Sequence, residues 1–109
     1  MRRLARRLTL EAREATPDGS GGRALTWRPL GEIWAEMTAR GGREEVAGGA
    51  PRSVTSWRIM VRGAPVGAPS RPRPEQRLRE GERVFDILAV AEADAAGRYL
   101  EILAEEGLA

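Results

Sequence analysis

The stretch Ser53-Val54-Thr55-Ser56-Trp57-Arg58-Ile59-Met60-Val61-Arg62 decides the fold class, because it has the two-residue period of a β-strand. One side of this strand carries residues that suit a core: Thr55, Trp57, Ile59 and Val61. The alternating positions form the second side, which includes two arginines: Val54, Ser56, Arg58, Met60 and Arg62. Since successive side chains of a strand point to opposite faces, we expect the first set to form the core face.

Other strand-like segments lie on both sides of this stretch, at residues 8–12, 24–28, 32–40, 84–90 and 98–104. The composition of residues 32–40 also suits a helix, but the segment is short, bounded by glycines and begins with β-branched and aromatic residues, so we predict a strand. Residues 16–22 have turn chemistry, and residues 92–97 suit a hairpin loop. Short strands at this spacing favour a small barrel or sandwich, and we predict an all-β fold: a small β-barrel of about six strands.

The chain has room for a single domain, residues 1–109, with a core that is thin relative to its surface. We expect a basic N-terminal tail at residues 1–7 and two long loops at residues 41–53 and 63–76. The first loop is rich in glycine around a charged middle and leaves room for one short helical turn. The second is rich in proline, glycine and arginine, which excludes regular structure.

The composition argues against catalysis. The sequence has no cysteine and no histidine, so it lacks thiolate nucleophiles and the commonest general base and metal ligand. We therefore expect no catalytic residues, no metal site and no cofactor. The net charge is only +2, from 18 basic residues, all arginine, and 16 acidic ones, so any contact with nucleic acid has to be a local patch.

The sequence also argues against a membrane protein. No window is apolar enough to form a membrane helix. The basic N-terminus is followed by charged residues where the middle of a signal peptide is apolar. We expect a soluble protein that is not exported by that route and makes no contact with a membrane.

An ordered series of short motifs runs along nearly the whole chain, from about residue 7 to residue 105. It consists of Asp18-Gly19-Ser20-Gly21-Gly22 before Trp27, Trp34-Ala35-Glu36, Gly42-Arg43-Glu44, Trp57-Arg58-Ile59-Met60-Val61-Arg62, Gly81-Glu82-Arg83-Val84-Phe85-Asp86-Ile87 and Arg98-Tyr99-Leu100-Glu101-Ile102. This series resembles the phage head–tail joining family, the small stopper or head-closure proteins of tailed phages. Residues 63–74 depart from the family pattern, because this connection is longer and richer in proline.

The resemblance implies a β-barrel subunit that is repeated in a ring, a hexamer or a dodecamer. The ring would lie at the head–tail junction of a tailed phage or a phage-like gene transfer particle, after assembly in the host cytoplasm. Its expected partners are the portal or adaptor ring above, a tail terminator or other tail proteins below, and double-stranded DNA in the channel.

The candidate site residues are mainly charged residues of the two predicted loops. We hypothesise that Arg40, Arg43 and Arg52 face the DNA channel, because guanidinium groups bind phosphate without reading sequence. Two further pairs are candidates for contacts between subunits or for docking: Glu44 and Glu45, and Arg71 and Arg73. The expected core or interface anchors are apolar and aromatic: Trp27, Trp34, Trp57, Phe85, Ile87, Leu100 and Ile102.

Two other functions stay open. A stand-alone barrel of the OB type that binds single-stranded nucleic acid fits the arginine and tryptophan content, although the balanced charge speaks against it. An enzyme that uses carboxylates such as Asp18, Asp86 and Asp94 is a weaker alternative, because the acids form no cluster with metal-ligand spacing.

Overall fold

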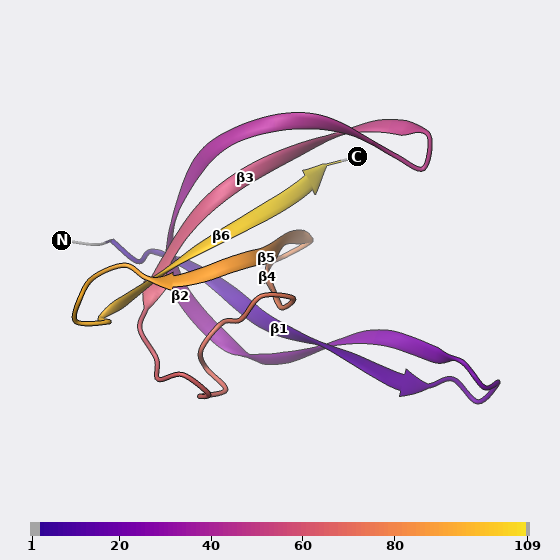
Figure 1. The fold of residues 1–109 in the computed structure, drawn as a ribbon, viewed down its shortest axis with the longest axis horizontal. Coiled ribbons are helices and arrows are strands. Elements are labelled where there is room, and N and C mark those ends of the chain that lie inside the picture. The colour runs from indigo at the N-terminus through magenta and orange to yellow at the C-terminus, as the bar shows by residue number, and fades with distance from the viewer. Residues whose placement is uncertain (1–2, 109) are drawn as a thin grey trace.

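The computed structural model describes residues 3–108 and consists of antiparallel strands joined by turns and loops (Figure 1). The strands are β1 (Arg6–Pro17), β2 (Arg23–Ala47), β3 (Ala50–Arg62), β4 (Arg77–Glu80), β5 (Arg83–Glu92) and β6 (Tyr99–Leu108). They pair in the order β1-β2-β3-β6-β5-β4, and β4 pairs with β1, so the sheet closes on itself as a barrel. The predicted all-β fold is confirmed. The short helix for which residues 41–53 left room does not form there.

Strand β2 is shared between two parts of the sheet, because it exchanges one partner for another along its length. From Arg23 to Ala35 it pairs with β1, and from Ala35 to Ala47 it pairs with β3. Two register shifts bend it, each beside a glycine with a positive φ, Gly31 at 148° and Gly41 at 141°. As a result the two halves of β2 diverge into two hairpin arms, at the lower right and upper right of Figure 1.

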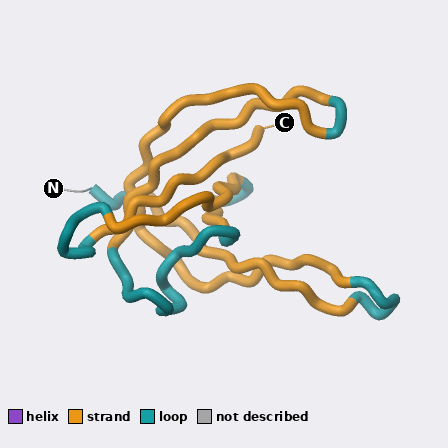
Figure 2. Tube along the Cα trace, in the orientation of Figure 1, coloured by secondary structure: helices purple, strands orange, loops and turns teal. Residues whose placement is uncertain are grey.

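We call residues 12–17 and 23–28 the first arm, and residues 41–53 the second arm. Figure 2 shows that only short turns cap the arms, whereas residues 63–76 form a long connection between β3 and β4 without helix or strand. The arms contribute to an elongated molecule with principal extents of 49 × 32 × 23 Å.

The prediction of a loop at residues 41–53 is wrong, because these residues form the second arm. Gly41 sits at a bulge instead of ending β2, and Gly48 and Gly49, both with positive φ, are sufficient for the turn. The ladder continues on both sides of that turn, from Gly41 opposite Ser56 to Ala47 opposite Ala50. A glycine-rich stretch was therefore compatible with a bent strand.

Two boundaries also differ from the prediction. Residues 24–28 and 32–40 belong to one strand, since Pro29 and Gly31 are accommodated at the register shift opposite β1, where β2 has a neighbour on one side only. The predicted tail at residues 1–7 is shorter, because Arg6 and Arg7 already pair with Ala35 and Trp34. Met1 and Arg2 lie outside the described residues. The predicted hairpin turns near residues 16–22 and 92–97 are confirmed.

The core lies inside the barrel and follows the two-residue period of the strands. Its fully or almost fully buried members are Leu8, Leu10, Ala35, Ile59, Val61, Leu78, Phe85, Ile87, Leu100, Ile102 and Ala104. On the predicted core face of β3, Ile59 and Val61 are completely buried, while Thr55 and Trp57 are half-buried nearer the second arm. Val54 and Met60 are also buried, although they lie on the outer face, where charged residues pair beside them in the ladder.

Candidate functional site

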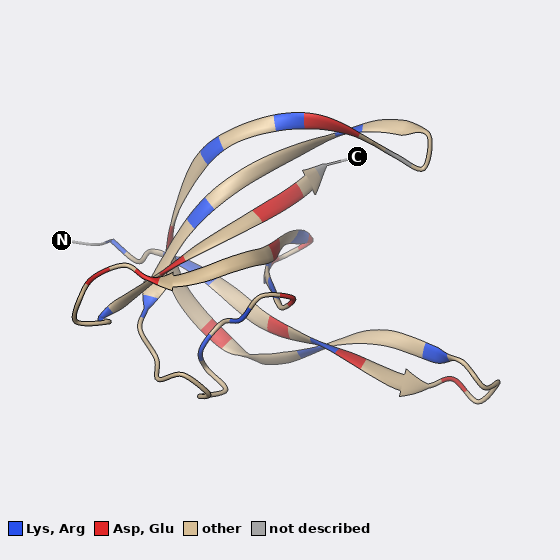
Figure 3. Cartoon of the chain, in the orientation of Figure 1, with Lys and Arg blue, Asp and Glu red and all other residues tan. Residues whose placement is uncertain are grey.

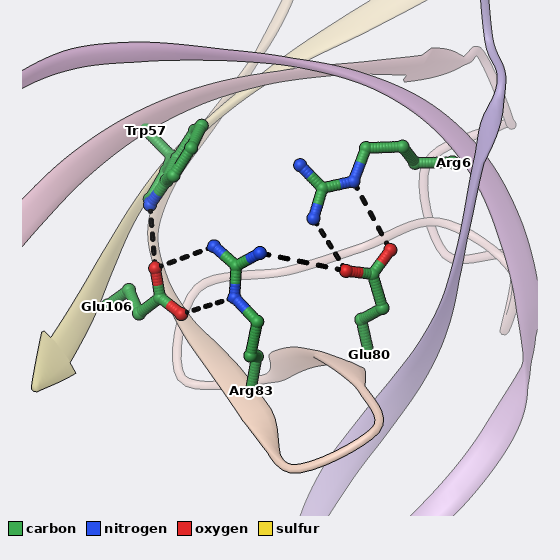
Figure 4. Close-up of polar contacts among 5 residues, drawn as sticks. All are labelled: Arg6, Trp57, Glu80, Arg83 and Glu106. Atoms are coloured by element: carbon green, nitrogen blue, oxygen red, sulfur yellow. Dashed lines mark hydrogen bonds and ion pairs between the residues drawn. The ribbon is translucent and has the colours of Figure 1, made fainter.

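A network of polar side chains lies where the core faces of five strands end, partly exposed to solvent (Figure 4). Its members are Arg6 from β1, Trp57 from β3, Glu80 from β4, Arg83 from β5 and Glu106 from β6. The two-residue period explains their inward direction: each charged member lies two positions from a buried core residue, namely Leu8, Leu78, Phe85 and Ala104. The core face of these four strands therefore ends in charged residues.

Glu106 is the most enclosed member of this network, with only 4% of its side chain exposed. It accepts hydrogen bonds from Arg83 Nε at 2.7 Å and Arg83 Nη2 at 3.0 Å, and from Trp57 Nε1 at 3.1 Å. Glu80 accepts hydrogen bonds from Arg6 Nη2 at 2.6 Å and Nε at 3.2 Å. Arg83 Nη1 lies 3.8 Å from Glu80 and so joins the two pairs into one network.

The charges of this network stabilise one another. The hydrogen bonds from Arg83 hold the pKa of Glu106 below its usual value, against the effect of burial, and Trp57 adds to the shift. The hydrogen bonds from Arg6 lower the pKa of Glu80 in the same way. Glu106 in turn raises the pKa of Arg83. Glu80, Arg83 and Glu106 are therefore charged at neutral pH. Together with Arg6 and Trp57 they connect five of the six strands.

A second charged cluster fastens β4 to β1 at the base of the first arm. The Glu11 side chain is 4% exposed and lies 2.6 Å from Arg77 Nε and 3.1 Å from Arg79 Nε. The Arg77 guanidinium also lies 4.1 Å from the centroid of the Trp27 ring, a cation–π contact. In the ladder between β1 and β4, Glu11 lies opposite Arg77, and Arg79 is two positions farther along the same face of β4.

The arginines predicted to face DNA are arranged on and beside the second arm. Arg43 forms ion pairs with Glu105 of β6 and, at 3.3 Å, with Glu45, and Arg52 Nε lies 2.9 Å from Glu45. The hydrogen bond from Arg43 lowers the pKa of Glu105, and Glu105 raises the pKa of Arg43. Arg43 and Arg52 are thus brought together by Glu45 and engaged within the chain.

Arg40 is not part of this row of ion pairs. It is exposed at the register shift between Ala39 and Gly41, and it has no ion pair among the described residues. Its role in a channel stays a prediction, as do those of Arg43 and Arg52.

The predicted docking residues differ in whether they have polar partners within the chain. Glu44 is exposed and has no polar partner in the described part of the chain, whereas Glu45 bridges two arginines. Arg71 Nη1 donates a hydrogen bond to the Ala64 carbonyl at 2.8 Å and thereby braces the connection at residues 63–76. The Arg73 guanidinium is exposed, and Arg73 lines a shallow pocket together with Arg13.

Among the predicted anchors, Phe85, Ile87, Leu100 and Ile102 lie in the core. Trp27 and Trp57 are half-buried in the contacts described above, and Trp57 also meets Phe85 edge-on with ring centroids 6.0 Å apart. Trp34 differs, because 54% of its surface is exposed.

Sequence reasoning missed three sets of charged residues: the barrel network, the Glu11 cluster, and the exposed arginines of the first arm, Arg13 and Arg23. The alternation of β1 pointed to Leu8 and Leu10 as core residues, and extending the same period backward would have placed Arg6 on the core face.

Basic and acidic segments alternate along both arms, so that no arm is uniformly basic (Figure 3).

The described residues contain no group of three or more histidine, cysteine, aspartate or glutamate side chains arranged to hold a metal ion. Within the same part of the chain, no helix has the length and hydropathy needed to cross a membrane.

Comparison with known proteins connects this architecture to a family. Residues 1–107 match the family model of the phage head completion protein. The chain belongs to the phage head completion protein family. This confirms the resemblance to head–tail joining proteins that the ordered motifs indicated.

Two solved structures are similar to this chain along almost their whole length. One is a chain of the virion of a native gene transfer agent particle, 49% identical, with a TM-score of 0.89, covering 99% of this chain and 98% of that chain. The other is the solution structure of protein SF1141 from Shigella flexneri 2a, 26% identical, with a TM-score of 0.65, covering 95% and 93%. No match was found among curated proteins.

Proposed function

We propose that this chain is a structural subunit of the head–tail connector of a tailed phage or a phage-like gene transfer particle. The observation that supports the proposal is the likeness to a gene transfer agent virion chain, 49% identical over 99% of this chain, together with the family match. In this proposal the subunits form a ring of six or twelve copies. The ring joins the portal or adaptor to the tail terminator or other tail proteins.

The distribution of exposed apolar residues favours assembly. Leu25 on the first arm is 62% exposed, Val46 on the second arm 75%, and Trp34 on the barrel 54%. A barrel of this size has limited core, and burying such residues against identical neighbours stabilises the folded chain. Contacts between different surfaces of identical subunits close into a ring when the rotation between neighbours permits.

The proposed ring surrounds double-stranded DNA, and exposed arginines without ion pairs are suited to its phosphates. Among residues 3–108, Arg40 is such a residue, and Arg13 and Arg23 on the first arm are two more. Arg43 and Arg52 would first have to exchange the carboxylates of Glu45 and Glu105 for phosphate. Contacts of this kind are independent of sequence and weaken as salt increases, which suits a conduit for any DNA.

The test is removal of the chain from cells that produce the particles, followed by electron microscopy of the products. The expected result is DNA-filled heads that carry no tails and release DNA, with joining restored when purified chain is added back. The number of copies per restored particle, measured by quantitative mass spectrometry, then distinguishes a ring of six from a ring of twelve. Particles that join normally without the chain would refute the proposal, and tight binding of single-stranded oligonucleotides by the monomer would favour an OB-type role.

A further inference from the structure

The exposed Trp34 lies in a groove on the outside of the barrel. The groove has a volume of about 290 Å³ and is lined by Glu32, Ile33, Trp34, Arg62, Gly63, Ala64 and Ser70. Trp34 supplies the largest apolar side chain of this surface and is more than half exposed. A large aromatic side chain in a groove is a common anchor of protein interfaces.

The charge at this groove is unbalanced. Glu32 is neutralised by Arg7, whose Nε lies 2.8 Å from the Glu32 carboxylate. Arg62 is exposed and has no ion pair or side-chain hydrogen bond among residues 3–108. The groove therefore presents an apolar surface beside an unpaired positive charge.

The second arm presents a complementary surface, an exposed apolar side chain beside an acidic one. Glu44 and Val46 lie two positions apart on the same face of β2, opposite Ser53 and Pro51 of β3. Val46 is 75% exposed, and Glu44 is exposed without a polar partner in the described structure. The ion pairs of Arg43, Glu45 and Arg52 lie on the other face of this arm, so they leave the Glu44–Val46 face free.

The first arm does not offer the same complementarity. Its exposed apolar residue, Leu25, shares a face with Arg23 and, across the ladder, with Arg13. Both arginines are exposed and unpaired within the described residues, so this face would bring positive charge toward Arg62. Like charges in an interface are unfavourable, and the second arm is therefore the better fit.

We propose that the Glu44–Val46 face of the second arm docks in the Trp34 groove of a neighbouring copy of this chain, with Glu44 facing Arg62 and Val46 facing Trp34. The arm cannot reach its own groove, because β3 begins at the arm and ends at Arg62. The strand spans 13 residues. The Glu44–Val46 face lies opposite Ser53 and Pro51 of this strand, so at roughly 3.3 Å per residue it is about 30–36 Å from Arg62. The occupant must come from a second copy.

This contact is heterologous, because it joins two different surfaces of the same chain. Each subunit offers one arm and one groove, so each added copy leaves one of each open until the ring closes. The inference rests on the proposed function and deepens it by assigning the residues through which adjacent subunits of the connector meet.

The test exchanges the two charges. The variants are Glu44→Arg, Arg62→Glu and the double variant Glu44→Arg/Arg62→Glu, each produced in place of the wild-type chain in particle-producing cells. We expect each single variant to be incorporated into particles at least about 10-fold less than wild type, and the double variant to return to within about 3-fold of it. Trp34→Ala is expected to reduce incorporation about 30-fold, as for an interface hot spot.

Glu82→Arg is the matched control, since Glu82 is an exposed acid without a partner among the described residues and lies at the β4–β5 turn, in neither docking surface. Equal unfolding midpoints show that the variants fold. Single variants that enter particles as wild type does, or a folded double variant that does not recover, would overturn the contact while leaving the connector role intact. Absence of the wild-type chain from particles would instead refute the connector role and the contact with it.

Discussion

Replacement of Glu106 by glutamine tests whether the charged network inside the barrel stabilises the fold. The substitution keeps the size of the side chain and one carbonyl oxygen, but it removes the negative charge. It also places an amide donor opposite Arg83 Nε, which now lies 2.7 Å from Oε2, while the remaining carbonyl oxygen stays at the Oε1 position beside Arg83 Nη2 and Trp57. Two charge-assisted hydrogen bonds are therefore weakened or lost, while Trp57 Nε1 keeps an acceptor.

The expected loss of stability follows from the burial of the two partners. A hydrogen bond to a charged group contributes about 1.5–3 kcal/mol, and the carboxylate is almost fully enclosed. Arg83 is 44% exposed, so its guanidinium regains water when the carboxylate is lost, which reduces the cost. We expect Glu106→Gln to lower the free energy of unfolding by about 2 kcal/mol. For a domain of this size that corresponds to a fall in Tm of about 10 °C.

The assay is chemical denaturation of the purified chain, followed by tryptophan fluorescence with the slope m held common to both proteins. Glu82→Gln is the matched control, because the same chemical change is made on an exposed acid without a partner in the described chain. We expect its unfolding midpoint to equal that of the wild type.

The pH dependence supplies a second readout. The folded-state pKa of Glu106 is lowered from 4.5, so the carboxylate contributes stability that is fully present above that pH. This contribution is lost as the pH falls through the lower folded-state value, and Glu80 acts in the same direction. The difference between wild type and Glu106→Gln should therefore be constant near neutral pH and shrink below pH 4.5. Equal stability at pH 7, or a loss that is unchanged at pH 3, would refute the reasoning.

Three further substitutions test other parts of the fold. Glu11→Gln should lower the free energy of unfolding by about 2 kcal/mol in chemical denaturation, because the enclosed carboxylate has two arginine partners. Gly63→Ala should cost about 3 kcal/mol, measured as a fall in Tm, because a Cβ there would lie 2.1 Å from the Gly97 carbonyl oxygen. Arg43→Gln should leave the denaturation midpoint unchanged within error, because its ion pairs are exposed to solvent.

The sequence predicted those strands whose core face is continuous. Residues 53–62 alternate without interruption, and the structure extends this strand by only three residues, to Ala50–Arg62. The segment at residues 32–40 was resolved correctly as a strand because bounding glycines and an aromatic residue outweighed its helical composition. In both cases the local pattern and the tertiary packing agree.

Strand β4 was missed for the opposite reason. Arg77–Glu80 has four residues, of which only Leu78 is apolar, so it contains too little of a pattern to detect. Its partners β1 and β5 define it, and Leu78 is fully buried between them. A strand of this kind is stabilised by its neighbours in space and cannot be read from its own residues.

The full length of β2 was not predicted either, because glycine and proline occur both at the ends of strands and at bulges within them. The sequence pattern predicts strand ends at Pro29, Gly31 and Gly41, whereas in the structure these residues lie at or beside register shifts that bend one long strand. The distinction depends on whether a partner strand continues past the bend, which is a property of the tertiary structure.

The charged barrel network and the proposed docking face both follow from the two-residue alternation of the strands. The network is paired within the chain, whereas the docking face is not. Inside the barrel, inward positions carry charges that find partners within the chain, as Arg83 does with Glu106. Along the second arm the inward side of β2 continues beyond the barrel, and there Glu44 and Val46 are exposed, with no strand of the described residues packed over them. The outer side of the same arm is already satisfied by Arg43, Glu45 and Glu105. In the proposed ring, the unsatisfied side is where a neighbouring subunit would gain most by binding, and this is why we propose the contact at that face.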